Sequence, residues 1–277
     1  MIGFGYYAGV VGAYNGLRTL GLKLNSFELP KATDLNDRAA LNAQLDQLTI
    51  PNVKIVLTGT GRVGQGAKEI LDHLNIKKVS VDQFINNSFT EAVYVQLDVL
   101  DYCERQDGNT LEKKDFFKHP EAYQSTFERF TAVADFFIAG HFYGKGAPAF
   151  FTREQAKSPS FNLKVVADIS CDINGPVACT IRPSTIDQPI YGYDAETETE
   201  VVFSNASAIA VMAVDNLPCE LPKDASEDFG NELIKHVLPA LIGEDTNKII
   251  ERASQTNLNG TLMPSFAYLK DYVAGNE

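Results

Sequence analysis

The chain has 277 residues, of which 24 are basic and 36 acidic, giving a formal net charge of −12. This length exceeds that of one ordinary compact domain, so we expect one large domain or two smaller ones. The negative charge argues against a nucleic acid partner and favours a small-molecule ligand, because binding a polyanion requires an excess of Lys and Arg.

The cysteines and the N-terminal segment indicate the cellular setting. Four cysteines are scattered without a CxxC pair, and no His stands at metal-ligand spacing, so we expect reduced thiols, no disulfide and no metal site. The first residues are apolar but carry no basic leader, and the run is too short and too Gly-rich for a membrane span. We therefore expect a cytoplasmic protein without a membrane partner.

Two helices are predicted before the first strand. Residues 5–20 carry glycines at three- and four-residue spacing, which would form one helix face suited to close contact with another backbone. Residues 34–48 place Leu41, Leu45 and Leu48 on one side with polar residues between them, a pattern typical of an amphipathic helix. The first helix is expected to pack on the sheet that follows, and the second is expected to lead into its first strand.

The segment from Val53 to Gly66, VKIVLTGTGRVGQG, is the most informative in the sequence. An apolar, β-branched run leads into Gly59-x-Gly61-x-x-Gly64 and then into a helical pattern, which predicts a strand, a tight turn and a helix. The first glycine would permit the turn, the second would let a pyrophosphate approach the backbone, and the third would let helix and strand pack. We interpret this as a dinucleotide fingerprint; a Gly-rich turn without a ligand is the alternative.

A second strand is predicted over Lys78 to Val81, ending at Asp82. An acid about 20 residues after the fingerprint accepts hydrogen bonds from the ribose hydroxyls and repels a 2′-phosphate, which favours NAD over NADP. The alternative is an Asp that only caps a loop. Ser80 and Arg62 lie close enough in sequence to keep NADP open.

Three later apolar runs, 135–139, 163–169 and 209–214, are typical of strands buried on both faces. Because ligands bind outside the carboxyl ends of such strands, the polar residues there are site candidates: His141, Asp168, Ser170 and Asp172. Residues 194–200 are expected to form a solvated hairpin. Residues 226–241 have helical spacing, with a kink expected at Pro239.

Several segments together resemble the lysine-ketoglutarate reductase and saccharopine dehydrogenase family and, more distantly, alanine dehydrogenase. They occur in collinear order over nearly the whole chain: TGTGRVGQGA, KHPEAYQSTFERF, ADISCDINGPVACTIRPSTIDQPIYGYDAET, VMAVDNLPCELPKDASEDFGNEL and NGTLMPSFAYL. The resemblance implies an α/β protein with a Rossmann-like, doubly wound parallel sheet and a second, catalytic domain. Here that second domain would be incomplete and built from the C-terminal helices.

The resemblance also implies a division of labour along the chain. Residues 1–215 would form the dinucleotide-binding domain with its N-terminal linking helix, and residues 216–277 would be the C-terminal segment of the catalytic domain. Family members carry a further segment before the part that matches Met1, and it holds the Lys and His that act as acid and base. A partner that supplies this half, or a homo-oligomer, is therefore expected.

Site residues follow from the resemblance by position. The glycines of the fingerprint, with Thr60, Arg62 and Val63 between them, would hold the pyrophosphate, and Asp82 the ribose. His141 and Phe142 would line the nicotinamide side, where Asp172 would be the carboxylate near the reacting carbon. Further cofactor contacts would come from the strand ends and the turn that crosses to the catalytic domain: Asp168, Ser170, Arg182, Val214, Asp215, Asn216 and Leu217.

Three functions remain open at this point. The first is an oxidoreductase that uses NAD, with NADP not excluded, to transfer hydride to or from the imine of lysine and 2-oxoglutarate. The second is an alanine dehydrogenase-like enzyme acting on a smaller amino acid and its 2-oxo acid. The third is a truncated remnant, or half of a split enzyme, that binds the nucleotide and catalyses nothing alone.

Overall fold

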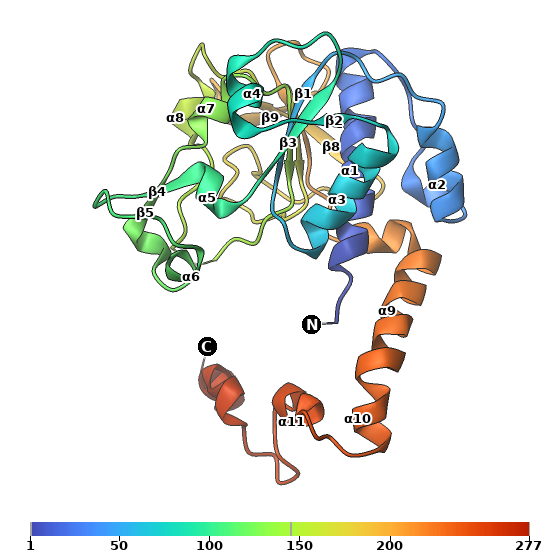
Figure 1. Cartoon of the computed structure of the whole chain (residues 1–277), viewed down its shortest axis with the longest axis vertical. Coiled ribbons are helices and arrows are strands. Elements are labelled where there is room, and N and C mark those ends of the chain that lie inside the picture. The colour runs from blue at the N-terminus through green and yellow to red at the C-terminus, as the bar shows by residue number, and fades with distance from the viewer. Residues whose placement is uncertain (1, 145, 277) are drawn as a thin grey trace. The chain divides into compact units, whose positions relative to one another are not determined.

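The computed structural model describes residues 2–144 and 146–276, and its centre is an eight-stranded, mostly parallel sheet (Figure 1). The strand order is β2-β3-β1-β6-β7-β10-β8-β9. Only β8 runs against its neighbours, pairing antiparallel with β10 and β9. The expected α/β class with a Rossmann-like sheet is confirmed, with an antiparallel edge added to it. The strands are β1 (Lys54–Thr58), β2 (Lys77–Lys78), β3 (Val93–Leu97), β6 (Phe136–Ala139), β7 (Val165–Asp168), β8 (Ile190–Asp194), β9 (Thr199–Val201) and β10 (Ile209–Met212).

The central strands are buried on both faces, as their continuous apolar sequences predict. Along β1, the side chains of Ile55 and Leu57 enter one hydrophobic cluster, whereas Val56 enters the other. This alternation follows from the two-residue period of a strand. Helices α1 and α3 lie on one side of the sheet, and α4, α7 and α8 on the other (Figure 1). The helices of the sheet unit are α1 (Gly5–Leu24), α2 (Arg38–Leu45), α3 (Arg62–His73), α4 (Val81–Asn86), α5 (Val99–Tyr102), α7 (Glu128–Thr131) and α8 (Arg153–Ala156).

The glycine-rich helix α1 packs against α3 at backbone distance, as its spacing predicts. A Cβ added to Gly9 would lie 1.9 Å from the carbonyl oxygen of Val63, and one added to Gly66 would lie 2.0 Å from that of Tyr6. Helix α2 is shorter than expected because the side chain of Asp37 caps it by accepting from the backbone N–H of Ala40. Its leucines at 41 and 45 are buried as predicted.

The segment from α3 to β3 differs from the sequence prediction in two ways. The strand expected over Lys78 to Val81 covers only Lys77–Lys78, and Val81 already begins helix α4, which Ser80 caps. One of the two strands that pair with β1 is β3, and the sequence prediction missed this strand. The later strands β6, β7 and β10 and the β8–β9 hairpin occur where they were predicted.

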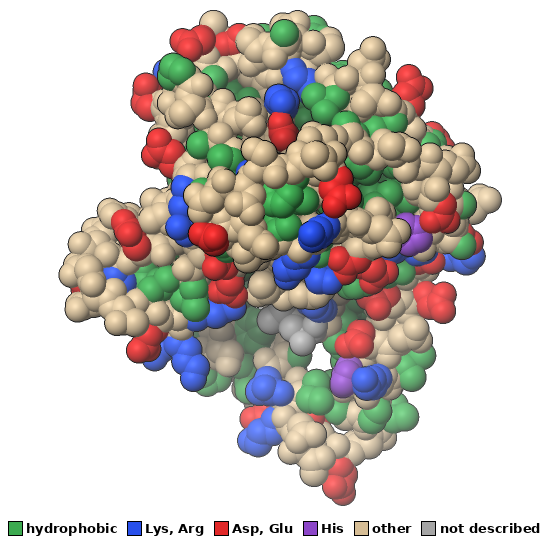
Figure 2. Space-filling model, turned by 45° about the horizontal axis from the view of Figure 1, so that its top comes forward, with side chains coloured by type: hydrophobic (Ala, Val, Ile, Leu, Met, Phe, Trp, Pro, Cys, Tyr) green, Lys and Arg blue, Asp and Glu red, His purple; other side chains and the backbone are tan. Residues whose placement is uncertain are grey.

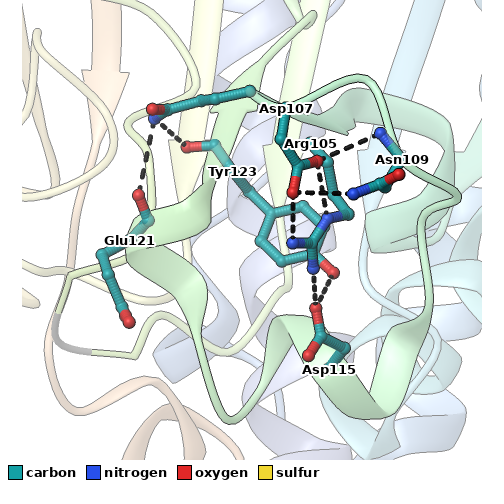
Figure 3. A network of polar contacts seen from close by, with 7 residues as sticks. Arg105, Asp107, Asn109, Asp115, Glu121 and Tyr123 are labelled. Atoms are coloured by element: carbon teal, nitrogen blue, oxygen red, sulfur yellow. Dashed lines mark hydrogen bonds and ion pairs between the residues drawn. The ribbon is translucent and has the colours of Figure 1, made fainter.

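A small arm interrupts the fold after β3. It contains the antiparallel strands β4 (Cys103–Arg105) and β5 (Tyr123–Ser125), helix α6 (Lys113–Phe116) and a 3-10 turn, η2 (Pro120–Ala122). Arg105 binds Asp107 through two hydrogen bonds of 2.9 and 2.6 Å and forms an ion pair with Asp115, whose carboxylate also accepts from the hydroxyl of Tyr123 (Figure 3). This network fixes α6 to the two strands.

The chain divides into two compact units, and the sheet with its helices and the arm belongs to the unit Phe4–Ala225. The second unit contains Ile2, Gly3 and the described residues after Ala225. Its start after Ala225 lies ten residues beyond the boundary expected from the resemblance. None of those residues is buried. The predicted helix with a break near Pro239 is present as α9 and α10. The sheet unit also contains η1 (Ala32–Asp34) and η3 (Leu217–Glu220), and α9 (Pro222–His236) begins in it. The second unit continues with α10 (Leu238–Ile242), α11 (Ile249–Ala253), η4 (Pro264–Leu269) and α12 (Lys270–Val273).

A buried carboxyl group links α1 to the turn η3. Glu220 is 2% exposed and accepts a hydrogen bond of 2.8 Å from the side chain of Asn15. Burial raises the pKa of Glu220 to about 7, and the hydrogen bond from Asn15 only partly opposes this shift. Ionising this group therefore costs folding free energy, up to about 3 kcal/mol for a shift of this size.

This burial predicts a pH-dependent stability. The folded state holds the proton of Glu220 to higher pH than the unfolded chain does, so its contribution to stability falls as pH rises from about 4.5 to about 7. Glu220→Gln should match the parent protein at pH 5 and exceed its melting temperature at pH 8. Glu28→Gln, at an exposed position, is the control and should show no such trend. Equal melting temperatures of parent and Glu220→Gln at pH 8 would contradict the prediction, which thermal denaturation monitored by circular dichroism checks.

Candidate functional site

A cavity of about 500 Å³ lies at the carboxyl ends of β3, β1 and β6. The chain order reverses between β1 and β6, because β3 and β2 lie on one side of β1 and the later strands on the other. This is the place where open α/β sheets bind their ligands. Its lining combines the glycine turn, the first residues after β3 and β6, and the arm: Gly5, Gly59, Thr60, Gly61, Arg62, Val63, Asp98, Val99, Tyr102, Lys113, Phe116, Phe117, Gly140, His141 and Phe142.

The three glycines of the fingerprint have different surroundings. Gly59 has φ +94°, a conformation that favours glycine, and a Cβ there would lie 2.3 Å from the carbonyl oxygen of Gly140. A Cβ on Gly64 would lie 2.1 Å from the carbonyl oxygen of Gly59. A Cβ on Gly61 would meet nothing within 4 Å. The first and third glycines are thus required by the fold, whereas the second leaves the space open that a ligand can occupy.

The start of α3 faces this open space and suits an anion. Gly61 is the N-cap of the 12-residue helix, no side chain caps it there, and its first turn contains no acidic residue. The N-terminal end of a helix attracts negative charge through its exposed N–H groups and its dipole. Arg62, the first residue of the helix, also lines the cavity and adds positive charge. The residues Gly59 to Val63 are therefore brought together as the fingerprint predicts.

The cavity wall contains an acid at a strand end, Asp98, which the sequence prediction missed. Asp98 follows β3, the strand next to β1, and accepts a 3.2 Å hydrogen bond from the hydroxyl of Thr60. Asp82, predicted for this position, lies in the first turn of α4, where it accepts from the side chain of Asn86, and it does not line the cavity. A run of strand-forming residues, VYVQL, followed by Asp, was the signal that could have identified Asp98.

His141 and Phe142 follow β6, which lies on the other side of β1 from β3, and both line the cavity as expected. The imidazole is 8% exposed, its Nδ1 lies 3.1 Å from the hydroxyl oxygen of Thr58, and its ring centroid is 4.3 Å from that of Phe150. Burial lowers the pKa of His141 to about 3, so the ring is neutral at physiological pH. Within the described part of the chain, its Nε2 has no hydrogen-bond partner. A buried ring that stays neutral is poorly suited to act as a general acid or base near neutral pH.

Asp168 is buried among its own neighbours rather than directed into the cavity. One carboxylate oxygen accepts from the backbone N–H and hydroxyl of Ser170 at 3.1 and 2.6 Å and from the backbone N–H of Cys171 at 3.1 Å. The other accepts from the hydroxyl of Thr180 at 2.6 Å. Burial raises the pKa of Asp168, although these hydrogen bonds oppose the shift. The carboxyl group thus holds together the loop that follows β7.

The remaining candidates do not line the cavity. Asp172 lies in the loop after β7, on the same rim of the sheet, and partial burial raises the pKa of its carboxyl group. The guanidinium of Arg182 binds Glu200 in the β8–β9 hairpin through two 2.6 Å hydrogen bonds. The structure therefore does not bring the following predicted residues to the cavity wall: Gly64, Asp82, Asp168, Ser170, Asp172, Arg182, Val214, Asp215, Asn216 and Leu217.

The comparison with protein families agrees with this geometry. The model named "Alanine dehydrogenase/PNT, C-terminal domain" matches residues 45–263, which is most of the chain. The chain belongs to the alanine dehydrogenase/PNT C-terminal domain family. The matched residues include the fingerprint, all eight strands of the sheet and every cavity residue except Gly5.

The chain is also similar to individual proteins of known name. Alpha-aminoadipic semialdehyde synthase, mitochondrial, of Mus musculus is 27% identical over 98% of this chain and 34% of that protein. Saccharopine dehydrogenase (NAD(+), L-lysine-forming) of Neurospora crassa is 26% identical over 85% of the chain and 56% of that protein. The chain thus spans about a third of the mouse relative. These relatives confirm the resemblance to the saccharopine dehydrogenase group.

A solved structure supports the fold. L-alanine dehydrogenase superposes with a TM-score of 0.53 at 16% identity, over 98% of this chain and 63% of that one. At this identity the likeness concerns the fold alone.

Among the described residues, none of the helices has the length and apolar composition of a membrane span.

Proposed function

We propose that the chain is the nicotinamide nucleotide-binding part of an NAD(P)-dependent oxidoreductase that acts on a carbon–nitrogen bond of an amino acid. One observation carries the proposal. The cavity lies at the point where the strand order reverses, with the open Gly61, the start of α3 and the strand-end carboxylate of Asp98 on its wall. This combination is typical of dinucleotide sites.

The residues present fit such a cofactor. Gly59 to Val63 would bind the pyrophosphate, and Asp98, in place of Asp82, would accept hydrogen bonds from the adenosine ribose. His141 and Phe142 would contact the nicotinamide end, since both line the cavity. Nicotinamide supplies hydride donor or acceptor chemistry when bound. The chain's own contribution would be orientation, since Asp98 and His141 line the same cavity from strands on opposite sides of β1.

We propose saccharopine-type chemistry, with hydride transfer to or from the imine of lysine and 2-oxoglutarate, as the reaction of the complete enzyme. Support comes from the relatives, which include saccharopine dehydrogenase of Neurospora crassa. Asp172 keeps its proposed role near the reacting carbon, because it follows β7, the strand beside β6. An alanine dehydrogenase-like reaction on a smaller 2-oxo acid is the alternative, because the fold is shared with L-alanine dehydrogenase.

A binding-only role for this chain is favoured by the chemistry of the cavity wall. Its one histidine among the described lining residues is held neutral, and Asp98 is engaged by Thr60 and a lysine. A positioned acid or base contributes ~10²–10⁴-fold to such a reaction. The second unit, whose described residues are all at least partly exposed, is typical of a segment that another part of an enzyme completes. We propose that a partner chain or a second copy supplies that half.

Titration with NADH tests the binding site, and turnover tests the reaction. NADH fluorescence should show saturable binding to the chain alone, with competition by ADP-ribose. Saccharopine oxidation should appear only after addition of a relative's N-terminal catalytic segment, and alanine should not replace saccharopine. The absence of saturable NADH and NADPH binding would refute the cofactor site. Turnover of alanine but not saccharopine by the reconstituted enzyme would favour the second reaction.

A further inference from the structure

A charge pair forms part of the cavity wall on the adenosine side. The ammonium group of Lys113, on helix α6, forms an ion pair with the carboxylate of Asp98. Both residues line the cavity, together with Phe116 and Phe117 of the same arm. The side chain of Lys113 is 46% exposed and that of Asp98 25%. A ligand that reaches Asp98 therefore also meets Lys113.

Contacts within the arm fix helix α6, which carries Lys113. Arg105 and Tyr123 both bind the carboxylate of Asp115, two residues after Lys113 (Figure 3). The ring of Phe116 is buried and contacts that of Tyr123 edge-on at 5.2 Å between centroids. Because α6 is fixed at two successive positions, the side chain of Lys113 starts from a defined point at the cavity wall.

The pair changes what Asp98 does electrostatically. An unpaired carboxylate at the end of this strand would accept hydrogen bonds from the ribose hydroxyls and repel a 2′-phosphate. Burial raises the pKa of Asp98, but the hydrogen bond and charge of Lys113 outweigh it, so that the pKa lies below its usual value. The carboxyl group of Asp98 is therefore ionised at neutral pH, and it stays paired with the ammonium group of Lys113. Their charges cancel, and the repulsion of a phosphate at this position is largely removed.

We propose that Lys113 determines cofactor choice at the adenosine 2′ position: it neutralises Asp98 and provides the cation that binds a 2′-phosphate, so that the site accepts NADPH as well as NADH. The inference deepens the proposed function and depends on it. On a 2′-hydroxyl cofactor, Asp98 accepts from the ribose while Lys113 stays paired with it. On a 2′-phosphate cofactor, Lys113 turns to the phosphate.

Arg62 is the other Lys or Arg among the described residues that line the cavity, and we expect it to act at a different part of the cofactor. It is the first residue of α3, directly after Gly61, where the pyrophosphate is proposed to bind. Lys113 is instead paired with Asp98, the residue that directly follows β3. Replacing Arg62 should therefore weaken phosphorylated and unphosphorylated cofactors alike, whereas replacing Lys113 should affect only the phosphorylated one.

Two small probes isolate the 2′ position from the rest of the cofactor. Adenosine 2′,5′-bisphosphate and 5′-AMP differ only in the 2′-phosphate, and both are measured as competitors of bound NADH on the full chain. Lys113→Met should weaken the bisphosphate about tenfold to a hundredfold, the range of one charge-assisted hydrogen bond, and change 5′-AMP by less than about threefold. Asp98→Asn, which keeps a helix-capping side chain, should strengthen the bisphosphate and weaken 5′-AMP.

The matched control is Lys114→Met. Lys114 neighbours Lys113 on α6 and carries the same charge, but it is exposed and does not line the cavity. This variant should bind both probes as the parent does, which separates a local contact from a change in net charge. Melting temperatures of both variants should match the parent's, since partly exposed ion pairs contribute little to stability.

The outcomes are distinguishable. Equal weakening of both probes by Lys113→Met, or a selective loss in Arg62→Met instead, would overturn the assignment of Lys113 while leaving the cofactor site intact. A parent protein that binds NADH but excludes NADPH and the bisphosphate would overturn it as well. If the parent binds neither NADH nor NADPH, the proposed function itself fails, and this inference fails with it.

Discussion

Gly61→Val should abolish nicotinamide nucleotide binding while leaving the fold intact. The new side chain would project into the cavity, where a Cβ at this position meets no protein atom within 4 Å. It would therefore occupy the space proposed for the pyrophosphate and displace it from the start of α3. We expect at least about a hundredfold loss of NADH affinity, which corresponds to ~3 kcal/mol. The melting temperature should change little, since a poor N-cap costs about 1 kcal/mol.

Two further glycine variants make this prediction specific. In Gly230→Val the added Cβ also meets nothing within 4 Å, but Gly230 lies in α9 and does not line the cavity, so NADH should bind as in the parent. In Gly64→Val the Cβ would collide with the carbonyl oxygen of Gly59, so both stability and binding should fall. Parent-like NADH titration of Gly61→Val, with all three variants checked by circular dichroism, would show that the open space is not the cofactor site.

The glycine turn was predictable from sequence because its requirements are local. Gly59 needs a positive φ, and the close contact between Gly64 and Gly59 joins residues five positions apart. Strands β1, β6, β7 and β10 were also predictable, because they are short apolar runs whose burial depends on little beyond their own composition. The same holds for helix α1, where glycine spacing alone predicted close backbone contact.

The acid on the adenosine side could not be located from spacing, because the chain inserts α4 and β2 between α3 and β3. Distance along the sequence pointed to Asp82, whereas adjacency to β1 in the sheet selects Asp98. Asp168 shows a related limit. Its place at a strand end suggested the cavity, but the loop donors Ser170, Cys171 and Thr180 turn its carboxylate inward. The pairing of distant strands and the path of a loop are properties of the fold, which neither spacing nor composition encodes.

Gly9→Ala should cause a large loss of folding stability. The added methyl group would lie 1.9 Å from the carbonyl oxygen of Val63 and 2.9 Å from the backbone nitrogen of Ala67. Neither backbone atom can move without separating α1 from α3, and that interface buries Val10 and Tyr14 completely. We expect a loss of about 3 kcal/mol or more, and a melting temperature lower by about 10 °C.

The matched control lies on the same helix. A Cβ at Gly5 would be 3.5 Å from a methyl carbon of Val63, an ordinary contact, so Gly5→Ala should melt at or near the parent's temperature. Because Val63 also lines the cavity, the displacement of α1 in Gly9→Ala should weaken NADH binding too, even below the melting transition. Identical melting curves for Gly9→Ala and Gly5→Ala would mean that α1 can withdraw from α3 at no cost, and the close approach of these helices would then not support the fingerprint turn.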